Sequence, residues 1–216
     1  GVASKGPLKN AMVTAYAIAA DGTVGAKLAE IKTDNAGAYT LNLGSYSGAV
    51  QLVVAVIPGQ STSKDEATGL DVTLPDDFKL RANTTVSAPT GGDSKVQSAS
   101  ITPFTELANQ IALDSGGLSA ANLTSAAKVV FDLIGVDPVA TKPLDSTVAP
   151  PAGATDDQKR YALFNAAVSA MANSAPTTTD ATTMACFTAA AADAGKKIKC
   201  ATEQIAKAVT VAAGAN

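Results

Sequence analysis

The side chains that could do chemistry in this chain are its carboxylates, lysines, tyrosines and two cysteines. Among 216 residues there are 19 Asp and Glu, 16 Lys and Arg, 4 Tyr, 2 Cys and no His. Because His is missing, neither a Ser-His-Asp nor a Cys-His nucleophilic site can form, and zinc sites that use His are excluded. A carboxylate pair could still hydrolyse a glycoside, but no spacing singles out such a pair. We therefore predict a protein that is not an enzyme and has no cofactor and no metal site.

Clusters of like charge are explained by local structure. Asp156-Asp157 fits the first turn of a helix, where carboxylates favour the positive end of the helix dipole. Asp76-Asp77 follows a proline and fits a turn. Calcium needs about six oxygen ligands or more, and no EF-hand-like run of acids is present. These acids are predicted to be structural.

Cys186 and Cys200 lie 14 positions apart, each in or beside a predicted helix of a hairpin that turns at residues 195–197. Two buried free thiols are one interpretation, and a disulfide that staples the hairpin is the other. The even count and the signs of export favour the disulfide.

Charge and hydropathy exclude two classes of partner. The formal net charge is −3, and charged residues make up 16% of the chain. No basic stripe is available to neutralise phosphates, so we predict no nucleic-acid binding. No apolar run approaches the roughly 18 residues of a membrane-spanning helix, so we predict no transmembrane segment. The weakly charged surface is common among exported bacterial proteins. We expect an extracellular or cell-surface location, with a leader or a lipid anchor upstream of Gly1.

The first hundred residues have the pattern of short β-strands separated by Gly, Pro and Asx turns, as in antiparallel sandwiches. Residues 38–43 alternate most cleanly, with Tyr39, Leu41 and Leu43 on one face. The expected strands are 12–18, 27–32, 38–43, 51–57, 70–74 and 78–82. We predict an antiparallel β-sandwich domain over residues 1–100.

From Ile101 the apolar period becomes helical. Thr102 and Pro103 supply an N-cap and a proline at the first helical position, and Thr155 opens a capping box. Helices are expected to begin near residues 103, 120, 156, 181 and 201. The third is expected to bury Tyr161, Leu163, Phe164, Val168 and Met171. We predict an Ala-rich α-helical bundle over residues 101–216 and hence an α+β chain of two domains.

Residues 33–39, Thr-Asp-Asn-Ala-Gly-Ala-Tyr, resemble the T-D-x-x-G-x-Y/F hairpin of carboxypeptidase regulatory-like domains, which have a transthyretin-like sandwich fold. Thr33 and Asp34 open the turn, Gly37 permits a positive φ, and Tyr39 returns a ring to the core. Residues 101–108, with Thr102 and Pro103, resemble a V-T-P-L-T-x-L-A segment. That segment follows such sandwiches in exported proteobacterial proteins, often lipoproteins. Neither resemblance implies chemistry.

Three functions are compatible with these residues. We favour a non-enzymatic extracellular or cell-surface structural protein that forms a homo-oligomer, a filament or a surface layer. Strand edges allow assembly by strand addition, and residues 1–5 and 208–212 are candidate donor segments. The second function is an envelope adhesin or carbohydrate-binding module, although 4 Tyr and no Trp offer few stacking platforms. The third is a carboxylate-based hydrolase.

Overall fold

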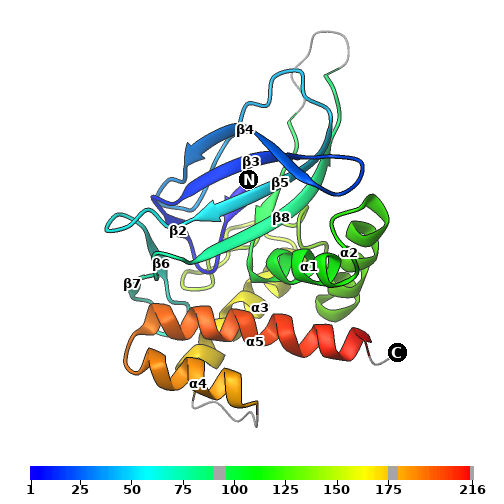
Figure 1. Cartoon of the computed structure of the whole chain (residues 1–216). Coiled ribbons are helices and arrows are strands. Elements are labelled where there is room, and N and C mark those ends of the chain that lie inside the picture. The colour runs from blue at the N-terminus through cyan, green and yellow to red at the C-terminus, as the bar shows by residue number, and fades with distance from the viewer. Residues whose placement is uncertain (90–95, 175–179, 215–216) are drawn as a thin grey trace.

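A computed structural model of the chain describes residues 1–89, 96–174 and 180–214. An N-terminal β region with antiparallel sheets is followed by a helical region, which confirms the predicted α+β class (Figure 1). The described strands are β1 (Val2–Ala3), β2 (Leu8–Lys9), β3 (Met12–Ile18), β4 (Val24–Lys32), β5 (Gly48–Ala55), β6 (Thr62–Lys64), β7 (Asp71–Thr73), β8 (Lys79–Val86) and β9 (Ser100–Ile101). The described helices are α1 (Pro103–Asp114), α2 (Ala120–Ile134), α3 (Asp156–Asn173), α4 (Ala181–Ala190) and α5 (Ala194–Gly214).

The largest sheet is antiparallel and has the order β4-β3-β5-β8. Its central strands β3 and β5 are rich in Val and Ala, and their registered pairs place apolar side chains on one face. That face buries Val13, Ala15, Leu52, Val54, Leu80 and Ala82. The predicted central strand at 51–57 is therefore confirmed, displaced slightly toward the N-terminus.

Short sheets complete the β region. β1 pairs in parallel with β9, and β2, β6 and β7 form a small antiparallel sheet. The predicted boundary between residues 100 and 101 falls inside β9. Buried apolar side chains of the β region and of the helices form one continuous cluster. The two regions therefore share a core.

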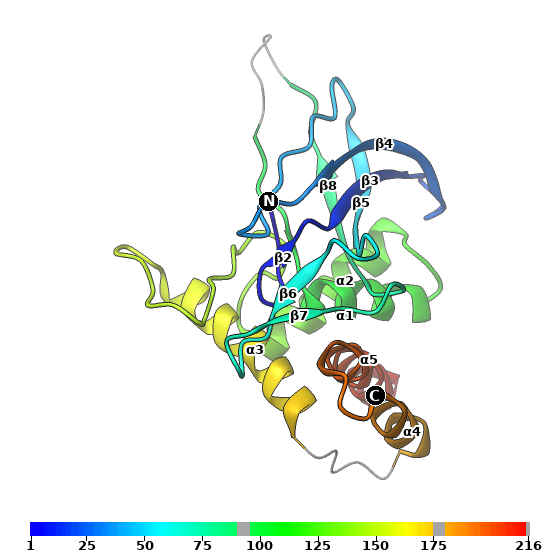
Figure 2. The ribbon, with the colours of Figure 1, turned by 90° about the vertical axis from the view of Figure 1, so that its left-hand side faces the viewer.

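Helix α1 packs on the other face of the main sheet through polar contacts (Figure 2). Asn109 accepts hydrogen bonds from Gln51 at 2.9 Å and from Asn83 at 3.0 Å. Glu106 pairs with the guanidinium of Arg81 and also accepts the Arg81 backbone N–H at 2.7 Å. That N–H belongs to the outer edge of β8, so the Glu106 carboxylate occupies one backbone donor of this edge.

Tyr161 joins three distant segments beneath the sheet. Its hydroxyl donates to the Pro138 carbonyl at 2.8 Å and also bonds to the Thr102 hydroxyl, which caps α1. Because the one Tyr161 proton goes to Pro138, Thr102 is the donor in the second bond. The Tyr161 side chain is fully buried, and burial raises the pKa of its phenol, which keeps the proton in place.

Three expectations about the elements are wrong. Residues 38–43 do not form a strand, although Leu41 and Leu43 are half-buried and the residues between them are exposed, as the alternation predicted. In α3, Leu163 is 70% exposed and Met171 37% exposed, because the buried stripe includes Asn165 and Ser169 instead. The last hairpin turns at 191–193, with Ala191 at a positive φ of 48°, and α5 begins at Ala194 instead of near residue 201.

Replacing Tyr161 by Phe should lower the free energy of unfolding by about 1–3 kcal/mol, because the Pro138 carbonyl and the Thr102 hydroxyl lose a buried partner. Urea denaturation followed by circular dichroism measures the change. Tyr16→Phe is the matched control, since the Tyr16 hydroxyl bonds to none of the described residues. Equal effects of the two substitutions would contradict the role given to Tyr161.

Candidate functional site

The turn motif at residues 33–39 lies against the N-terminal segment. The Thr33 hydroxyl donates to the Leu8 carbonyl at 2.6 Å and accepts the Ala11 N–H at 3.0 Å. The Asp34 carboxylate accepts the N–H groups of Ala36 and Ala38, both at 2.8 Å. Among the described residues, the hydrogen bonds of both side chains therefore all hold backbone groups.

Gly37 and Tyr39 hold β1 in place. Gly37 has a φ of 71°, and its carbonyl accepts the Ala3 N–H at 2.8 Å. A Cβ at this position would lie 2.4 Å from the Ala3 oxygen, so a side chain is excluded here. The Tyr39 hydroxyl donates to the Ala99 carbonyl at 2.8 Å. Like Thr102 and Pro103 at the start of α1, the predicted motif residues therefore act in the architecture.

The segment 40–43 belongs to no described helix or strand, its side chains alternate between exposed and half-buried, and it adjoins a cavity with apolar lining residues. None of the described residues forms a backbone hydrogen bond with Thr40, Leu41 or Asn42. The adjoining cavity has a volume of about 570 Å³, and its apolar lining includes Leu41, Leu43, Val50, Leu52, Val86 and Ala99. An added β-strand needs free backbone groups to pair with and pockets for its side chains, and this segment and the cavity beside it can supply both.

The pairing of β1 shows on which side a neighbour would lie. Gly1 and Tyr39 exchange two backbone hydrogen bonds, of 2.8 and 3.0 Å. Backbone groups of alternate residues in an extended chain point to the same side, so those of Leu41 point the same way as those of Tyr39. We call the space beside residues 40–43, in line with β1, the strand lane. A strand in this lane would bond to Leu41.

The edge of β4 is a second exposed edge, but its geometry is irregular. β4 pairs with β3 on one side only, and two bulges interrupt this pairing between Ala15 and Ile18 of β3. β4 also carries exposed charges, including the Lys27–Glu30 ion pair at 3.0 Å. Bulges and charges of this kind protect edges from pairing with other chains.

A cleft of about 880 Å³, lined by several charged side chains, lies between α5, α1 and the start of β8. Its four carboxylates all have partners: Asp77 pairs with Lys199, Glu106 with Arg81, Asp114 accepts from Gln110, and Glu203 lies 3.9 Å from Lys199. The hydrogen bond from Lys199 holds the pKa of Asp77 below its usual range. The cleft therefore contains acids engaged in ion pairs and hydrogen bonds.

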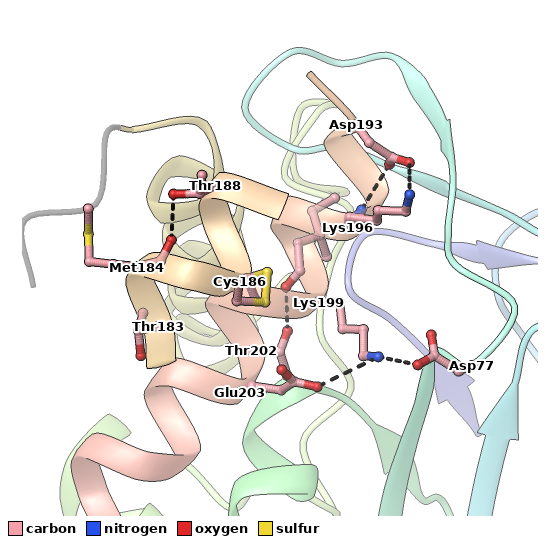
Figure 3. Close-up of a disulfide and its surroundings, with 12 residues drawn as sticks. Asp77, Thr183, Met184, Cys186, Thr188, Asp193, Lys196, Lys199, Thr202 and Glu203 are labelled. Carbon is pink, nitrogen blue, oxygen red and sulfur yellow. Dashed lines mark hydrogen bonds and ion pairs between the residues drawn. A yellow bond between two sulfur atoms is a disulfide. The ribbon is translucent and has the colours of Figure 1, made fainter. Parts of the chain in front are cut away.

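The two cysteines form a disulfide between α4 and α5, as predicted (Figure 3). Their Cα atoms are 5.9 Å apart, which suits a disulfide. Around it, Lys196 bonds to Asp193, and Lys199 reaches Asp77 of the β region, as the dashed lines in Figure 3 show. Lys196 and Lys199, which precede Cys200 on α5, thus neutralise nearby carboxylates.

A buried ionic cluster joins the N-terminal segment to α3. The side chains of Lys5 and Glu66 are 0% and 2% exposed, and Nζ lies 2.5 Å from Oε2. Ser169 on α3 accepts a hydrogen bond from Lys5 and donates one to Glu66 at 2.8 Å. The Gly6 N–H donates to the other Glu66 oxygen at 2.7 Å. No sequence signal pointed to this cluster, because its members come from three distant parts of the chain.

The neighbouring Asp65 docks the same loop on α3. Burial alone would raise the pKa of Asp65, but hydrogen bonds from Thr68, the Ala67 N–H and Asn173 lower it. Asp65 therefore stays ionised and holds the loop between β6 and β7 against the helix.

Searches for other kinds of site gave three findings. Among the described residues, no group of three or more Cys, Asp or Glu could hold a metal ion. No helix in the described part of the chain is long and apolar enough to cross a membrane. Comparisons with models of known families, with curated proteins and with solved structures found no match.

Removing the disulfide by Cys186→Ser and Cys200→Ser should lower the free energy of unfolding by up to about 3 kcal/mol, because the unfolded chain regains the freedom of a closed loop. Amide exchange should show α4 losing protection first, since its contacts are mainly with α5. Thermal melts of the wild type and the double variant, each with and without reductant, measure the effect. Reductant should lower the melting temperature of the wild type and leave that of the double variant unchanged. An unchanged melting temperature of the fully reduced wild type would contradict the prediction.

Proposed function

We propose that this protein is a non-enzymatic, exported structural subunit that assembles with copies of itself by strand addition in the strand lane. The observation that carries the proposal is the segment 40–43, whose side chains alternate in exposure and whose residues Thr40, Leu41 and Asn42 have no backbone partner among the described residues, beside the cavity of about 570 Å³. A strand from a second copy would supply hydrogen-bond partners for the backbone and apolar side chains for the cavity.

The other strand edges fit less well. Glu106 occupies the Arg81 N–H on the outer edge of β8, and the edge of β4 is irregular and charged. The strand lane has neither of these protections, since Thr40, Leu41 and Asn42 are uncharged and their backbone is free of partners among the described residues. The lane is therefore the favoured site of assembly.

The two donor segments that the sequence suggested are both engaged in their own chain. Residues 1–5 include β1, and Val2, Ala3, Ser4 and Lys5 are all buried. Residues 208–212 belong to the backbone of α5. Neither segment can therefore act as a donor without leaving its place in its own chain.

The remaining features agree with a structural role outside the cytoplasm. The chain has no His, and each carboxylate that lines the 880 Å³ cleft has an ion-pair or hydrogen-bond partner. A disulfide persists in oxidising compartments such as the periplasm or the cell exterior. The resemblance to a carboxypeptidase regulatory-like domain of exported proteins points in the same direction and stays part of the proposal.

Light scattering after size-exclusion chromatography and negative-stain microscopy of the purified chain test the proposal. We expect the wild type to form oligomers or filaments as its concentration rises. Leu41→Asp should leave a folded monomer, because it places a charge beside the apolar cavity. Ile31→Asp on β4 is the matched control and should assemble normally, since Ile31 is already 42% exposed.

A second variant distinguishes the strand lane from other surfaces. A short run of alternating Thr and Val added ahead of Gly1 would continue β1 and fill the lane from within the chain. This variant should be monomeric and more stable than the wild type. A wild type that stays monomeric at its highest soluble concentration would overturn the proposal, as would normal assembly of the extended variant.

A small-molecule site is the second candidate function. The volume of the cavity lies in the range of ligand pockets, and Tyr39 and Tyr46 are among its lining residues. A glycan array tests this candidate, because a carbohydrate ligand would give a signal that Leu41→Asp abolishes.

A further inference from the structure

The buried cluster of Lys5, Glu66 and Ser169 has the composition and geometry of a self-forming cross-link. We propose that Lys5 and Glu66 condense into an amide bond, with Ser169 passing the proton. The lysine Nζ lies 2.5 Å from Glu66 Oε2, both side chains are almost fully buried, and Ser169 Oγ contacts both groups. This inference does not depend on assembly of the protein.

The reaction is a condensation that balances without an oxidant or co-reactant. The Lys5 ammonium first gives a proton to the Glu66 carboxylate, which produces an amine and a carboxylic acid. The amine lone pair attacks Cδ of Glu66, and a C–N bond forms. A proton leaves the attacking nitrogen through Ser169 Oγ and reaches Oε2, the C–Oε2 bond breaks, and one water departs.

Two groups are placed to assist these steps. The Gly6 N–H donates to Glu66 Oε1 at 2.7 Å, so it can hold the negative charge that develops on this oxygen during attack. Ser169 accepts from Lys5 and donates to Oε2, the oxygen that leaves. The reacting groups are also held together by the fold, which raises their effective concentration.

Burial gives the product an advantage over the ion pair. Two charges removed from water cost free energy that their mutual attraction repays only in part. An amide carries no charge, and the released water returns to the solvent. In an exposed pair, bulk water stabilises the two charges, so the ion pair is favoured over the amide.

The chain contains a matched control for this difference. Lys9 and Asp71 form a similarly close pair, 2.6 Å apart, on β2 and β7, the two outer strands of the small sheet. Their side chains are 22% and 46% exposed. Lys9 should therefore remain a free amine in the same molecule in which Lys5 is bonded.

Intact-mass spectrometry of the purified, reduced wild-type chain tests the proposal without a variant. We expect a mass lower than that of the sequence by one water. After tryptic digestion, the chain should be uncut after Lys5 and cut after Lys9, and one peptide pair should be joined through Lys5 and Glu66. A mass equal to that of the sequence would overturn the proposal. Loss of water located at Asp21-Gly22 would also overturn it, because an aspartate followed by glycine can cyclise and lose water without Lys5. Loss of ammonia with a bond from Lys5 to the side-chain amide of Asn165, which is buried, would overturn it as well.

Two variants separate the chemistry from the fold. Lys5→Met removes the nucleophile and should give the mass of its own sequence. Ser169→Ala keeps the ion pair but loses the proton path, so bond formation should slow by about 100-fold or more after refolding from denaturant. An unchanged rate in Ser169→Ala would remove Ser169 from the reaction, and a water loss that persists in Lys5→Met would overturn the assignment.

Discussion

The buried ammonium of Lys5 constrains how the N-terminal segment can lie. A charge with no access to water needs hydrogen-bond partners on all sides, and here they come from Glu66 in the loop between β6 and β7 and from Ser169 in α3. The hydrogen bonds of Lys5 therefore bring together the segment after the first strand, a loop of the small sheet and a helix that lies far along the chain. The hydrogen bonds of β1 to Gly37 and Ile101 then position the turn motif and the start of the helical region.

Polar contacts of this kind compensate for a shortage of large apolar side chains. The aromatic share of the chain is only 4%, so the interfaces between elements cannot rely on rings and long aliphatic groups alone. Instead, Arg81 and Glu106 join β8 to α1, and Thr102 and Tyr161 join α1 to α3. Each contact is directional, so it favours one relative arrangement of sheet and helices over others that would bury a similar apolar area.

Local signals predicted most of the elements, because their causes lie within a few residues. Thr102, Ser119, Thr155 and Asp180 cap helices at the expected positions, and Gly135 ends α2 in a left-handed conformation. The even count of cysteines and the signs of export favoured the disulfide over two free thiols, and the structure contains it. The sequence could not show that residues 38–43 lack a strand, because alternation shows which face is apolar but not whether a partner strand exists. The Lys5–Glu66 pair was equally out of reach, since 61 positions separate its members and neither has a local motif.

The strand lane and the buried cluster lie along one path through the molecule. A strand bonded to Leu41 would pull on the segment that includes Tyr39, and because Tyr39 is bonded to Gly1, part of the load would reach the backbone pair of Gly1 and Tyr39 and then residues 2–4. β1 has only two residues, so its hydrogen bonds to β9 and to the turn at Gly37 would break one after another under such a load. Lys5 follows directly, and a bond from its side chain to Glu66 would stop this separation from spreading into β2 and β3. A subunit that carries load through its first strand thus benefits most from a covalent link at the position where this chain buries a lysine.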